Sequence, residues 1–313
     1  MNVIRDLDSL KKGPLLRPVL TIGNFDGVHR GHLALFDKVK ARAKAIGGQS
    51  AVMTFEPHPI KVVKPGNGPR LITPTDQKLE LIWKAGVEAL ICLPFNTEFA
   101  AVSAQDFVQV ILVDSIGIKE IVVGYDYTFG HNREGNIPLL QRMGEDLGFK
   151  VHIVGPVQIG DTLVSSTSIR RLVQEGHLQE AKRLLGRNYQ IHGTVMRGQN
   201  RGARLLGFPT ANLELVDELF PKAGVYAVTV IIDGKSYQGV TNIGYNPTFG
   251  QNRLTIETHV LDFSEDLLGK TIKVNFVERL RDEKPFPDVQ ALSEQIRQDI
   301  QDARKLLNTP DAG

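Results

Sequence analysis

The sequence lacks the residues and segments that mark several large classes of protein. Its single cysteine, Cys92, cannot form an internal disulfide or a thiolate zinc cluster, which favours a reducing compartment. The longest apolar run, residues 225–232, contains a threonine and is far too short to span a membrane. The first residues, 1–13, have no apolar segment typical of a signal peptide. We therefore expect a cytoplasmic protein without a membrane partner.

Charge of one sign is not in excess either. The chain has 37 lysine and arginine residues against 35 aspartate and glutamate residues, which gives a formal net charge of +2 and an isoelectric point near 8.5. Proteins dedicated to binding nucleic acid are usually far more basic. We therefore expect no nucleic-acid partner, although local arginine and histidine residues can still bind small polyphosphates.

What is present is an ordinary globular composition in a chain long enough for two domains. Hydrophobic residues make up 42% and charged residues 23% of the 313 residues. In the first part, apolar runs of strand length alternate with helical patterns, and these runs begin at Pro18, Ser50, Glu88, Lys119 and Lys150. The alternation predicts an α/β domain over residues 1–186, Rossmann-like with a parallel sheet, whose ligands lie beyond the carboxyl ends of the strands.

From residue 187 onward, strand-like stretches follow one another with little helix between them. They begin at Tyr189, Gly224, Lys235, Leu254 and Thr271. Asp233 and Gly234, between two of these stretches, are typical of a type I′ hairpin turn. An apolar stripe over residues 289–307 predicts an amphipathic helix. We predict a mainly β domain over residues 187–313, a small antiparallel barrel of the Greek-key type with a C-terminal helix.

The first chemical motif, GNFDGVHRGH, follows the first predicted strand of the parallel sheet and opens a helix. Its glycines let the backbone approach a ligand closely, and free N–H groups at a helix N-terminus favour phosphate. His29 and His32 are expected to point the same way and to stabilise charge during phosphoryl or nucleotidyl transfer. A zinc site lacks a nearby cysteine or carboxylate at a familiar ligand spacing, and a plain glycine turn with two exposed histidines is the simpler alternative. The candidate ATP-binding residues here are Gly23, Asn24, Phe25, Asp26, Gly27, His29 and His32.

A second motif, SSTSIRRLVQEG, opens a later helix at residues 165–176. In the simpler interpretation its hydroxyl groups cap the helix while Ile169, Leu172 and Val173 face the core. In the functional interpretation Arg170 binds phosphate as a bidentate donor. Together with HxGH, the motif resembles the nucleotidyltransferases that join a nucleoside monophosphate to a phosphate acceptor. The resemblance implies further ATP-binding residues, namely Ser165, Ser166, Thr167 and Arg170.

Two more segments of the first half resemble the flavin-side loops of bacterial FAD synthetases. FEPHP ends the second predicted strand, and GYDYTFGHNREG ends the fourth. Their aromatic side chains offer faces for a flavin ring, although buried aromatic residues more often belong to the core. The flavin-binding residues that the resemblance implies are Phe55, Pro57, His58, Pro59, Asp126 and Phe129.

In the second half, GFPTAN at residues 207–212 resembles the signature of riboflavin kinases. In that family the threonine and asparagine oxygens help to hold the magnesium ion of the nucleotide, which implies Thr210 and Asn212 as ligands of Mg²⁺. Without the resemblance, the motif is a proline turn with an asparagine cap. The glycine- and arginine-rich stretch before it is either a polyphosphate loop or a solvated basic turn. The candidate ATP-binding residues are Gly198, Arg201, Gly202, Arg204, Gly207, Thr210 and Asn212.

Further segments follow in the order and approximate spacing of the riboflavin kinase family. In TIETHVL, alternation along a strand places Thr255, Glu257 and His259 on one face. A strand glutamate is usually just solvated, but the resemblance implies Glu257 as the base that takes the proton of the ribityl hydroxyl group. In RLRDEKPF, it implies Arg279 and Glu283 as flavin-binding residues.

Together, the two halves resemble the bifunctional riboflavin kinase and FAD synthetase family of prokaryotes. The resemblance implies an ATP-dependent transferase that uses Mg²⁺ and whose substrates and products include riboflavin, FMN, FAD and ATP. Glu257 would serve the phosphorylation of riboflavin. His29, His32 and Arg170 would serve the adenylylation of FMN, which releases pyrophosphate. The alternatives are a kinase joined to an inactive adenylyltransferase domain and a flavin- or nucleotide-binding regulator, and the oligomeric state stays open.

Overall fold

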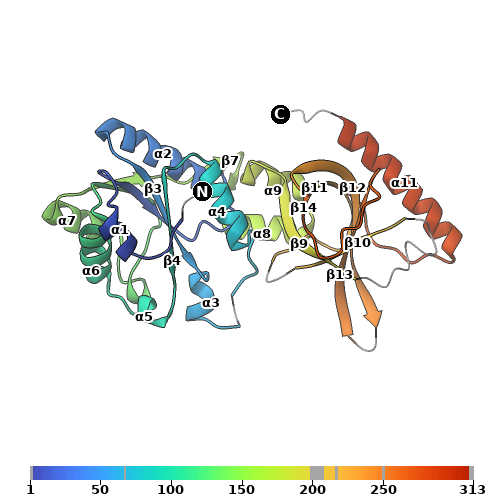
Figure 1. Cartoon of the computed structure of the whole chain (residues 1–313), viewed down its shortest axis with the longest axis horizontal. Helices are drawn as coiled ribbons and strands as arrows, with labels where there is room; N and C mark the ends of the chain where they lie inside the picture. The colour runs from blue at the N-terminus through green and yellow to red at the C-terminus, as the bar shows by residue number, and fades with distance from the viewer. Residues whose placement is uncertain (1–2, 67, 198–207, 216–217, 249–250, 310–313) are drawn as a thin grey trace. The chain divides into compact units, whose positions relative to one another are not determined.

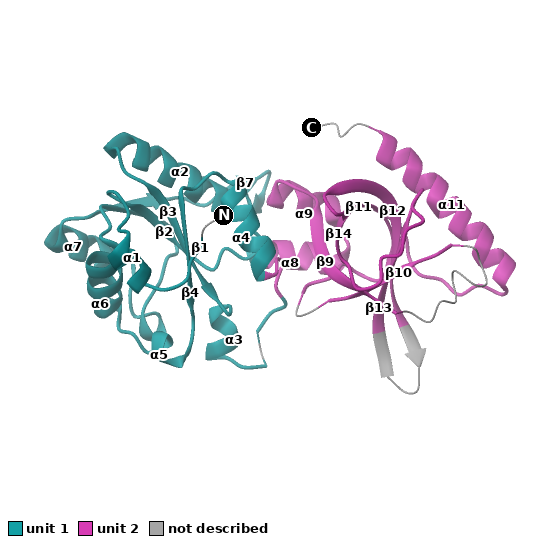
Figure 2. Cartoon of the chain, in the orientation of Figure 1, with its two compact units in different colours: residues 1–70, 75–166 teal, residues 71–74, 167–313 magenta. Residues whose placement is uncertain are grey.

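The computed structural model of the chain describes residues 3–66, 68–197, 208–215, 218–248 and 251–309. The chain packs as two compact units (Figure 1, Figure 2). The first unit comprises residues 1–70 and 75–166, and the second unit comprises residues 71–74 and 167–313. The domain boundary expected at residues 186/187 stays a prediction.

A six-stranded sheet forms the centre of the first unit, and its neighbouring strands are parallel. In spatial order the strands are β1 (Val3–Ile4), β4 (Ala89–Pro94), β3 (Ser50–Glu56), β2 (Val19–Ile22), β5 (Glu120–Gly124) and β6 (Lys150–Val154). The five apolar runs of the sequence are strands β2 to β6, which confirms the predicted α/β architecture. Strand β1 was not predicted, because two residues at a sheet edge carry no periodic signal.

The order of the strands changes direction at β2. From β2 the chain builds the sheet outward through β3 and β4, and β5 then begins the other half on the opposite side of β2. In open parallel sheets, ligands bind at such a switch point, beyond the carboxyl ends of the strands. GNFDGVHRGH begins directly after β2, so the fold places this motif at the switch point.

Helices connect the strands of the first unit (Figure 1). The α-helices are α1 (Asp8–Lys12), α2 (Arg30–Ile46), α3 (Pro59–Val63), α4 (Thr75–Lys84), α5 (Thr97–Ala100), α6 (Ala104–Asp106) and α7 (Ile137–Leu147). A π-helix, η1 (Phe107–Ile116), continues α6, and a 3₁₀-helix, η2 (His131–Arg133), follows β5. A short hairpin of β7 (Gln158–Ile159) and β8 (Thr162–Leu163) ends the unit.

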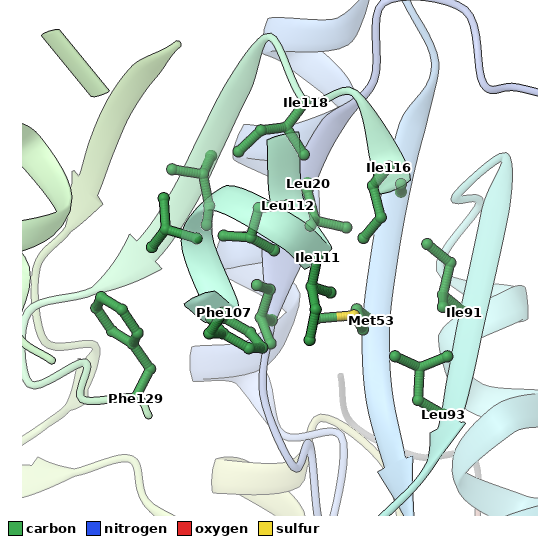
Figure 3. Packing of buried hydrophobic residues seen from close by; sticks show 14 of the residues in the cluster. Leu20, Met53, Ile91, Leu93, Phe107, Ile111, Leu112, Ile116, Ile118 and Phe129 are labelled. Carbon is green, nitrogen blue, oxygen red and sulfur yellow. The ribbon is translucent and has the colours of Figure 1, made fainter. Parts of the chain in front are cut away.

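Apolar side chains cover both faces of the parallel sheet. On one face, strand residues Leu20, Met53 and Ile91 belong to a cluster with Phe107 and Leu112 of the π-helix (Figure 3). On the other face, the cluster comprises Val52, Leu90 and Cys92 of the strands, Phe36 of α2, and Leu79 and Ile82 of α4. Successive side chains of a strand point to opposite faces, so a sheet covered on both sides needs strands that are apolar throughout.

A closed barrel of six antiparallel strands forms the centre of the second unit. Around the barrel the strands are β10 (Ala211–Glu214), β13 (Gln251–Val260), β12 (Lys235–Thr248), β11 (Gly224–Ile232), β14 (Thr271–Arg281) and β9 (Tyr189–Met196). Strand β14 returns to pair with β11, the first of three consecutive hairpin strands, which is Greek-key order. Asp233 and Gly234 join β11 to β12 with φ of 47° and 81°, as a type I′ turn requires. The predicted barrel is confirmed.

Helices precede and follow the barrel. They are α8 (Ser166–Glu175), whose first residue ends the first unit, α9 (Leu178–Leu185) and α11 (Val289–Asn308). Ile300, Ala303 and Leu307 of α11 pack on Val225 and Val240 of the barrel, which confirms the predicted amphipathic C-terminal helix. Within the described ranges, no helix is both long enough and apolar enough to cross a membrane.

Candidate active sites

The loop after β2 turns sharply before α2 begins. Phe25, Gly27 and Val28 have φ of 49°, 89° and 37°. A positive φ is costly for a residue with a Cβ atom, above all for a β-branched valine, so the surrounding structure must hold this turn. Phe25 and Val28 are each only 2% exposed, and a Cβ atom on Gly23 would lie 2.9 Å from the ring of Phe25. Buried side chains therefore fix the backbone of this loop.

His29 and His32 form a stacked pair at the start of α2. His29 is the N-cap residue, and its Nδ1 accepts a hydrogen bond from the backbone N–H of His32 at 3.3 Å. The two ring centroids lie 3.5 Å apart, and the ring planes differ by 18°. A Cβ atom on Gly31 would come within 3.1 Å of the His29 ring, so the glycine makes room for the pair. The expectation that the two imidazoles point the same way is confirmed.

Two hydroxyl groups from other elements hold carbonyl oxygens of the same loop. Thr54 of β3 donates from Oγ1 to the backbone oxygen of Asn24 at 3.2 Å, and Ser166 donates from Oγ to the backbone oxygen of Asp26 at 2.9 Å. The structure thus joins the GNFDGVHRGH loop to the start of the SSTSIRRLVQEG helix. Arg170 is partly buried in α8 of the second unit, and its action beside the histidines stays a prediction.

The FEPHP segment leaves β3 through a cis peptide bond between Glu56 and Pro57. His58 is the N-cap residue of α3, and its Nδ1 accepts a hydrogen bond from the N–H of Ile60 at 3.2 Å. Pro59 occupies the first turn of this helix, where its missing N–H costs no hydrogen bond. His58 therefore caps a helix in this structure, and its contact with flavin stays a prediction.

A buried lysine fixes the end of β3. Lys78 of α4 is 4% exposed, and its Nζ donates to the backbone oxygen of Phe55 at 3.0 Å. Burial lowers the pKa of the Lys78 ammonium group, and the carboxylates of Glu56 and Asp26 oppose that shift. The ammonium group of Lys78 thus attracts one carboxylate at the end of β3 and another in the loop after β2.

The aromatic candidates for flavin binding lie in or beside the core. Phe129 packs 5.8 Å from Phe107 between ring centroids, and Phe55 packs 5.4 Å from Phe99, which also contacts Phe107. Asp126, from the same segment as Phe129, is exposed. Any ring that stacks on Phe55 or Phe129 must reach a side chain that is more than nine-tenths buried, and these roles stay predictions.

In the second unit, Glu257 lies on β13 between the short strand β10 and the long strand β12. Its register partners are Asn212 in β10 and Asn242 in β12. Thr210 donates from Oγ1 to Oε2 of Glu257 at 3.4 Å. The two neighbours of Glu257 along the strand are buried, so Glu257 occupies the opposite face, as the alternation predicted. The fold thus brings GFPTAN and TIETHVL together.

The surroundings of Glu257 raise the pKa of its carboxyl group. Burial raises the pKa of Glu257, the carboxylate of Glu283 raises it further, and the hydrogen bond from Thr210 partly offsets both. Glu283 is held by Asn242, whose Nδ2 donates to Oε1 at 3.2 Å. A Cβ atom on Gly244 would collide with the Glu283 carboxylate, so a side chain there would displace Glu283 from its present position. A carboxylate with a raised pKa accepts a proton readily, as a general base must.

A cavity of about 440 Å³ opens beside Glu257, lined by the barrel and α11. Its polar side includes Thr210, Asn242, Glu257, His259 and Glu283, and its apolar side includes Val225, Val240, Leu292, Ile296 and Ile300. Nδ1 of His259 lies 2.7 Å from the backbone oxygen of Pro209 and holds the GFPTAN segment. The volume and the mixed lining are typical of a site for a small organic ligand.

The flavin candidates of RLRDEKPF have different positions. Glu283 lines this cavity, whereas Arg279 is not among its described lining residues. The Arg279 guanidinium donates from Nη2 to the backbone oxygen of Ala223 at 2.7 Å and to Asp282 Oδ1 at 2.6 Å. Arg281 lines the cavity, and flavin binding by Arg279 stays a prediction.

The oxygen atoms around GFPTAN suit a hard cation. Thr210, Asn212 and Glu257 supply hydroxyl, amide and carboxylate oxygens from neighbouring segments. Among the described residues, no group of three or more His, Cys, Asp and Glu side chains is arranged to hold a metal ion. Magnesium at this site would therefore depend on few protein oxygens together with water and phosphate, as it commonly does. The candidates outside the described residues are Gly198, Arg201, Gly202, Arg204 and Gly207.

Known protein families match both halves of the chain. The family model for FAD synthetase matches residues 14–168, and the model for riboflavin kinase matches residues 185–307. A bifunctional riboflavin kinase/FMN adenylyltransferase of Pseudomonas fluorescens is 40% identical over 308 residues, which is 98% of each chain. This chain belongs to the bifunctional riboflavin kinase/FMN adenylyltransferase family.

Other members of the riboflavin kinase/FMN adenylyltransferase family match over similar lengths. The protein of Escherichia coli strain K12 is 38% identical over 308 residues, again 98% of each chain. A solved structure from Streptococcus pneumoniae, described as a macrolide-efflux protein, superposes with a TM-score of 0.86 at 32% identity and covers 97% of this chain and 98% of its own. The fold predicted from the sequence is therefore found in a solved structure along nearly the whole chain.

Some residues at the two candidate sites carry no signal in the sequence. Thr54 and Lys78 support the first site, while Asn242 and Arg281 belong to the second. Their partners lie far away in the chain, so no local motif marks them. The position of Asn242 beside Glu257 follows only from the pairing of β12 with β13.

Proposed function

We propose that this chain converts riboflavin to FMN with one ATP and then FMN to FAD with a second ATP. Phosphorylation is assigned to residues 187–313 and adenylylation to residues 1–186, in a protein of the cytoplasm. The family membership over both halves supports the pair of activities. The geometric observation that carries the proposal is Glu257, placed beside Thr210 and Asn212 at the edge of a ligand-sized cavity.

In the phosphorylation step, Glu257 is the proposed general base. The terminal ribityl hydroxyl group of riboflavin is neutral and must lose its proton as its oxygen attacks the γ-phosphorus of ATP. Glu257 takes that proton while the new O–P bond forms, the bond from the γ-phosphorus to the bridging oxygen breaks, and ADP leaves. The raised pKa of Glu257 matches this role.

The apolar side of the cavity is the proposed place of the isoalloxazine ring. Val225 and Val240 of the barrel and Leu292 and Ile296 of α11 line this part of the cavity, so both elements supply apolar surface for a ring. A flat aromatic ring bound between these side chains would be removed from contact with water on both of its faces. The ribityl chain then extends toward the polar side, where Glu257 lies.

Magnesium is proposed to accompany ATP at the polar side. Thr210 and Asn212 would hold the ion through their side-chain oxygens, with water and phosphate oxygens completing its shell. When bound, the ion would neutralise charge on the β- and γ-phosphates. Gly198, Arg201, Gly202, Arg204 and Gly207 are proposed to bind the same nucleotide.

In the adenylylation step, the nucleophile already carries charge. The phosphate of FMN is an anion near neutral pH, so its oxygen attacks the α-phosphorus of ATP without a base while the bond to the leaving pyrophosphate breaks. His29 and His32 are proposed to donate hydrogen bonds to the phosphate oxygens at the N-terminus of α2, where the helix dipole also favours negative charge. Arg170 is proposed as a further donor, and FEPHP with Asp126 and Phe129 as the flavin side.

The decisive experiment follows the flavins themselves. The full chain is incubated with riboflavin, ATP and MgCl₂, and the products are separated by chromatography over time. We expect FMN first and FAD later, and excess EDTA should stop the formation of FMN. Absence of FMN would disprove the kinase assignment. FMN that never becomes FAD, even when FMN is supplied directly, would disprove the adenylyltransferase assignment.

A further inference from the structure

A largely buried ion pair joins β14 to α11 at the cavity. Arg281 donates from Nε to Asp299 Oδ1 at 2.9 Å and from Nη2 to Asp299 Oδ2 at 2.8 Å, so the pair is bidentate. The side chains of Arg281 and Asp299 are 20% and 6% exposed. Gln295, one turn earlier in α11, also donates to Asp299 Oδ1 at 3.0 Å. The carboxylate is therefore held from two elements at once.

Both members of the pair line the same cavity as Glu257. Asp299 lies on α11 next to Ile300 and one turn after Ile296, which form part of the apolar wall. Arg281 is the register partner of Val225, which lies on the facing wall. The ion pair thus connects the two walls that the flavin ring is proposed to enter between.

An ion pair withdrawn from water adds little to the stability of the folded protein. Removing two charges from water costs about as much as their attraction returns, and well-packed apolar residues often stabilise as much or more. A bidentate guanidinium–carboxylate pair does fix distance and orientation, which apolar contacts do not. Because the pair lies between the two walls of the cavity, it can fix their distance and orientation.

We propose that Arg281 and Asp299 are a positioning pair that holds α11 at the separation from the barrel that a planar flavin ring requires, and so sets the riboflavin affinity of the kinase. The proposal rests on the proposed function of this cavity. The pair does not touch the reacting hydroxyl group or phosphate in this scheme. Its loss should therefore change riboflavin binding far more than the rate of phosphoryl transfer at saturation.

The experiment compares three variants of the full chain. Asp299→Asn keeps the shape and removes the charge, and Arg281→Met with Asp299→Leu replaces the whole pair by apolar side chains. The control is Asp262→Asn, which breaks an exposed ion pair of α11, Arg304 to Asp262 at 2.8 Å. Each variant is tested for KM of riboflavin, KM of ATP, kcat, thermal unfolding and conversion of supplied FMN to FAD.

We expect Asp299→Asn to raise the riboflavin KM at least about tenfold, with kcat changed by less than about threefold and the ATP KM unchanged. The apolar double variant should unfold at the temperature of the unaltered chain but keep a raised riboflavin KM. Asp262→Asn should leave every value unchanged. If the riboflavin KM follows the unfolding temperature across the variants, or stays normal in the apolar double variant, the positioning role is wrong. Failure of the unaltered chain to make FMN would instead refute the proposed function.

Discussion

The candidate sites of the two units are built from different kinds of backbone. In the first unit, His29 and His32 stand where a loop with three positive φ angles runs into a helix. In the second unit, Glu257 stands on a regular strand between Asn212 and Asn242 of its neighbours. The first candidate site has two imidazoles at a helix N-terminus, whereas the second has a carboxylate whose pKa is raised by burial.

This difference fits the nucleophile of the step that we propose for each site. The phosphate of FMN, with a second pKa of about 6, is already anionic at neutral pH and needs only donors that stabilise the added charge. The hydroxyl group of riboflavin is neutral and needs a base. When two sites bind the same nucleotide, the charge of the group that attacks the phosphorus therefore determines whether the site needs a helix N-terminus or a carboxylate.

The largest effect is expected for Glu257→Gln. The amide keeps the size of the side chain but cannot accept the proton, so FMN formation should fall by about 10²–10⁴-fold. Conversion of supplied FMN to FAD should not change, because that step is proposed to use the other unit. Separate initial rates for the two steps, measured by chromatography, check this prediction.

The pH profile sharpens the same test. Because the pKa of Glu257 is raised by burial, FMN formation should decline with falling pH at a higher pH than an ordinary glutamate would give. The decline should be absent from the residual activity of Glu257→Gln. Glu265→Gln, at an exposed carboxylate of the same unit, is the matched control and should behave like the unaltered chain. Equal loss of both steps in Glu257→Gln would refute the division of labour.

The converse effect is expected for His32→Ala. Loss of one preorganised donor to a developing charge typically costs about 10²–10³-fold, so FAD formation should fall by that factor while FMN still accumulates. His29→Asn is the companion variant, since asparagine retains an N-cap acceptor for α2 and removes only the imidazole. It should also slow FAD formation with little loss of stability.

His177→Ala provides the control for the histidine variants. This exposed histidine is the N-cap residue of α9 and lies in none of the proposed site segments. It should leave both rates unchanged. If His32→Ala slowed FMN formation as much as FAD formation in a folded protein, the assignment of one step to each unit would fail.

Much of the fold was predictable because it depends on local patterns. Continuous apolar runs marked β2 to β6, and Asp233 with Gly234 marked the hairpin between β11 and β12. Strand β10 was missed, because its four residues follow a proline and owe their conformation to pairing with β9 and β13. Short strands of this kind are defined by their neighbours rather than by their own periodicity.

The candidate sites divide in the same way. His29, His32, Thr210 and Glu257 lie in short motifs. The loop and helix pattern indicated the two histidines, and the resemblance to riboflavin kinases indicated Thr210 and Glu257. Lys78 was missed because its use depends on the backbone oxygen of Phe55. The pairing of Arg281 with Asp299 depends on how α11 packs over the barrel. Contacts that require tertiary structure leave no local pattern.

The two units also bury a carboxyl group in different ways. In the first unit, Glu120 is 2% exposed and accepts hydrogen bonds from Arg42 at 2.7 Å and from His152 at 2.8 Å, and these partners lower its pKa. In the second unit, Glu218 is also 2% exposed and accepts from the backbone N–H of His192 at 3.2 Å. Burial raises the pKa of Glu218 to about 8. The opposite shifts predict opposite pH dependence of stability.

For Glu218, the folded state binds its proton more tightly than the unfolded state does. The second unit should therefore lose stability as the pH rises from about 4.5 to about 8, by a few kcal/mol in all. Glu218→Gln keeps an acceptor for His192 and removes the ionisation. It should match the unaltered chain near pH 4.5 and be more stable at pH 8.

Hydrogen exchange of the barrel strands, measured by mass spectrometry at both pH values, checks the Glu218 prediction. Glu214→Gln, at an exposed position of β10, is the control and should leave the exchange rates unchanged at either pH. Glu218→Gln that is less stable than the unaltered chain at pH 8 would contradict a protonated carboxyl group at this position.

The smallest effect is expected for His152→Ala in the first unit. Glu120 has a lowered pKa, so its contribution to stability is present above the ordinary glutamate pKa and is lost as the pH falls through the folded value. Removing the hydrogen bond from His152 while Arg42 remains should cost about 1–2 kcal/mol near pH 7 and shift acid unfolding of this unit to higher pH. Trp83 of α4, the only tryptophan in the sequence, reports that unfolding by fluorescence. His177→Ala, at an exposed histidine 3.9 Å from Glu175, is the control. Equal effects of His152→Ala and His177→Ala on unfolding would show that the hydrogen bond from His152 to Glu120 does not stabilise the first unit.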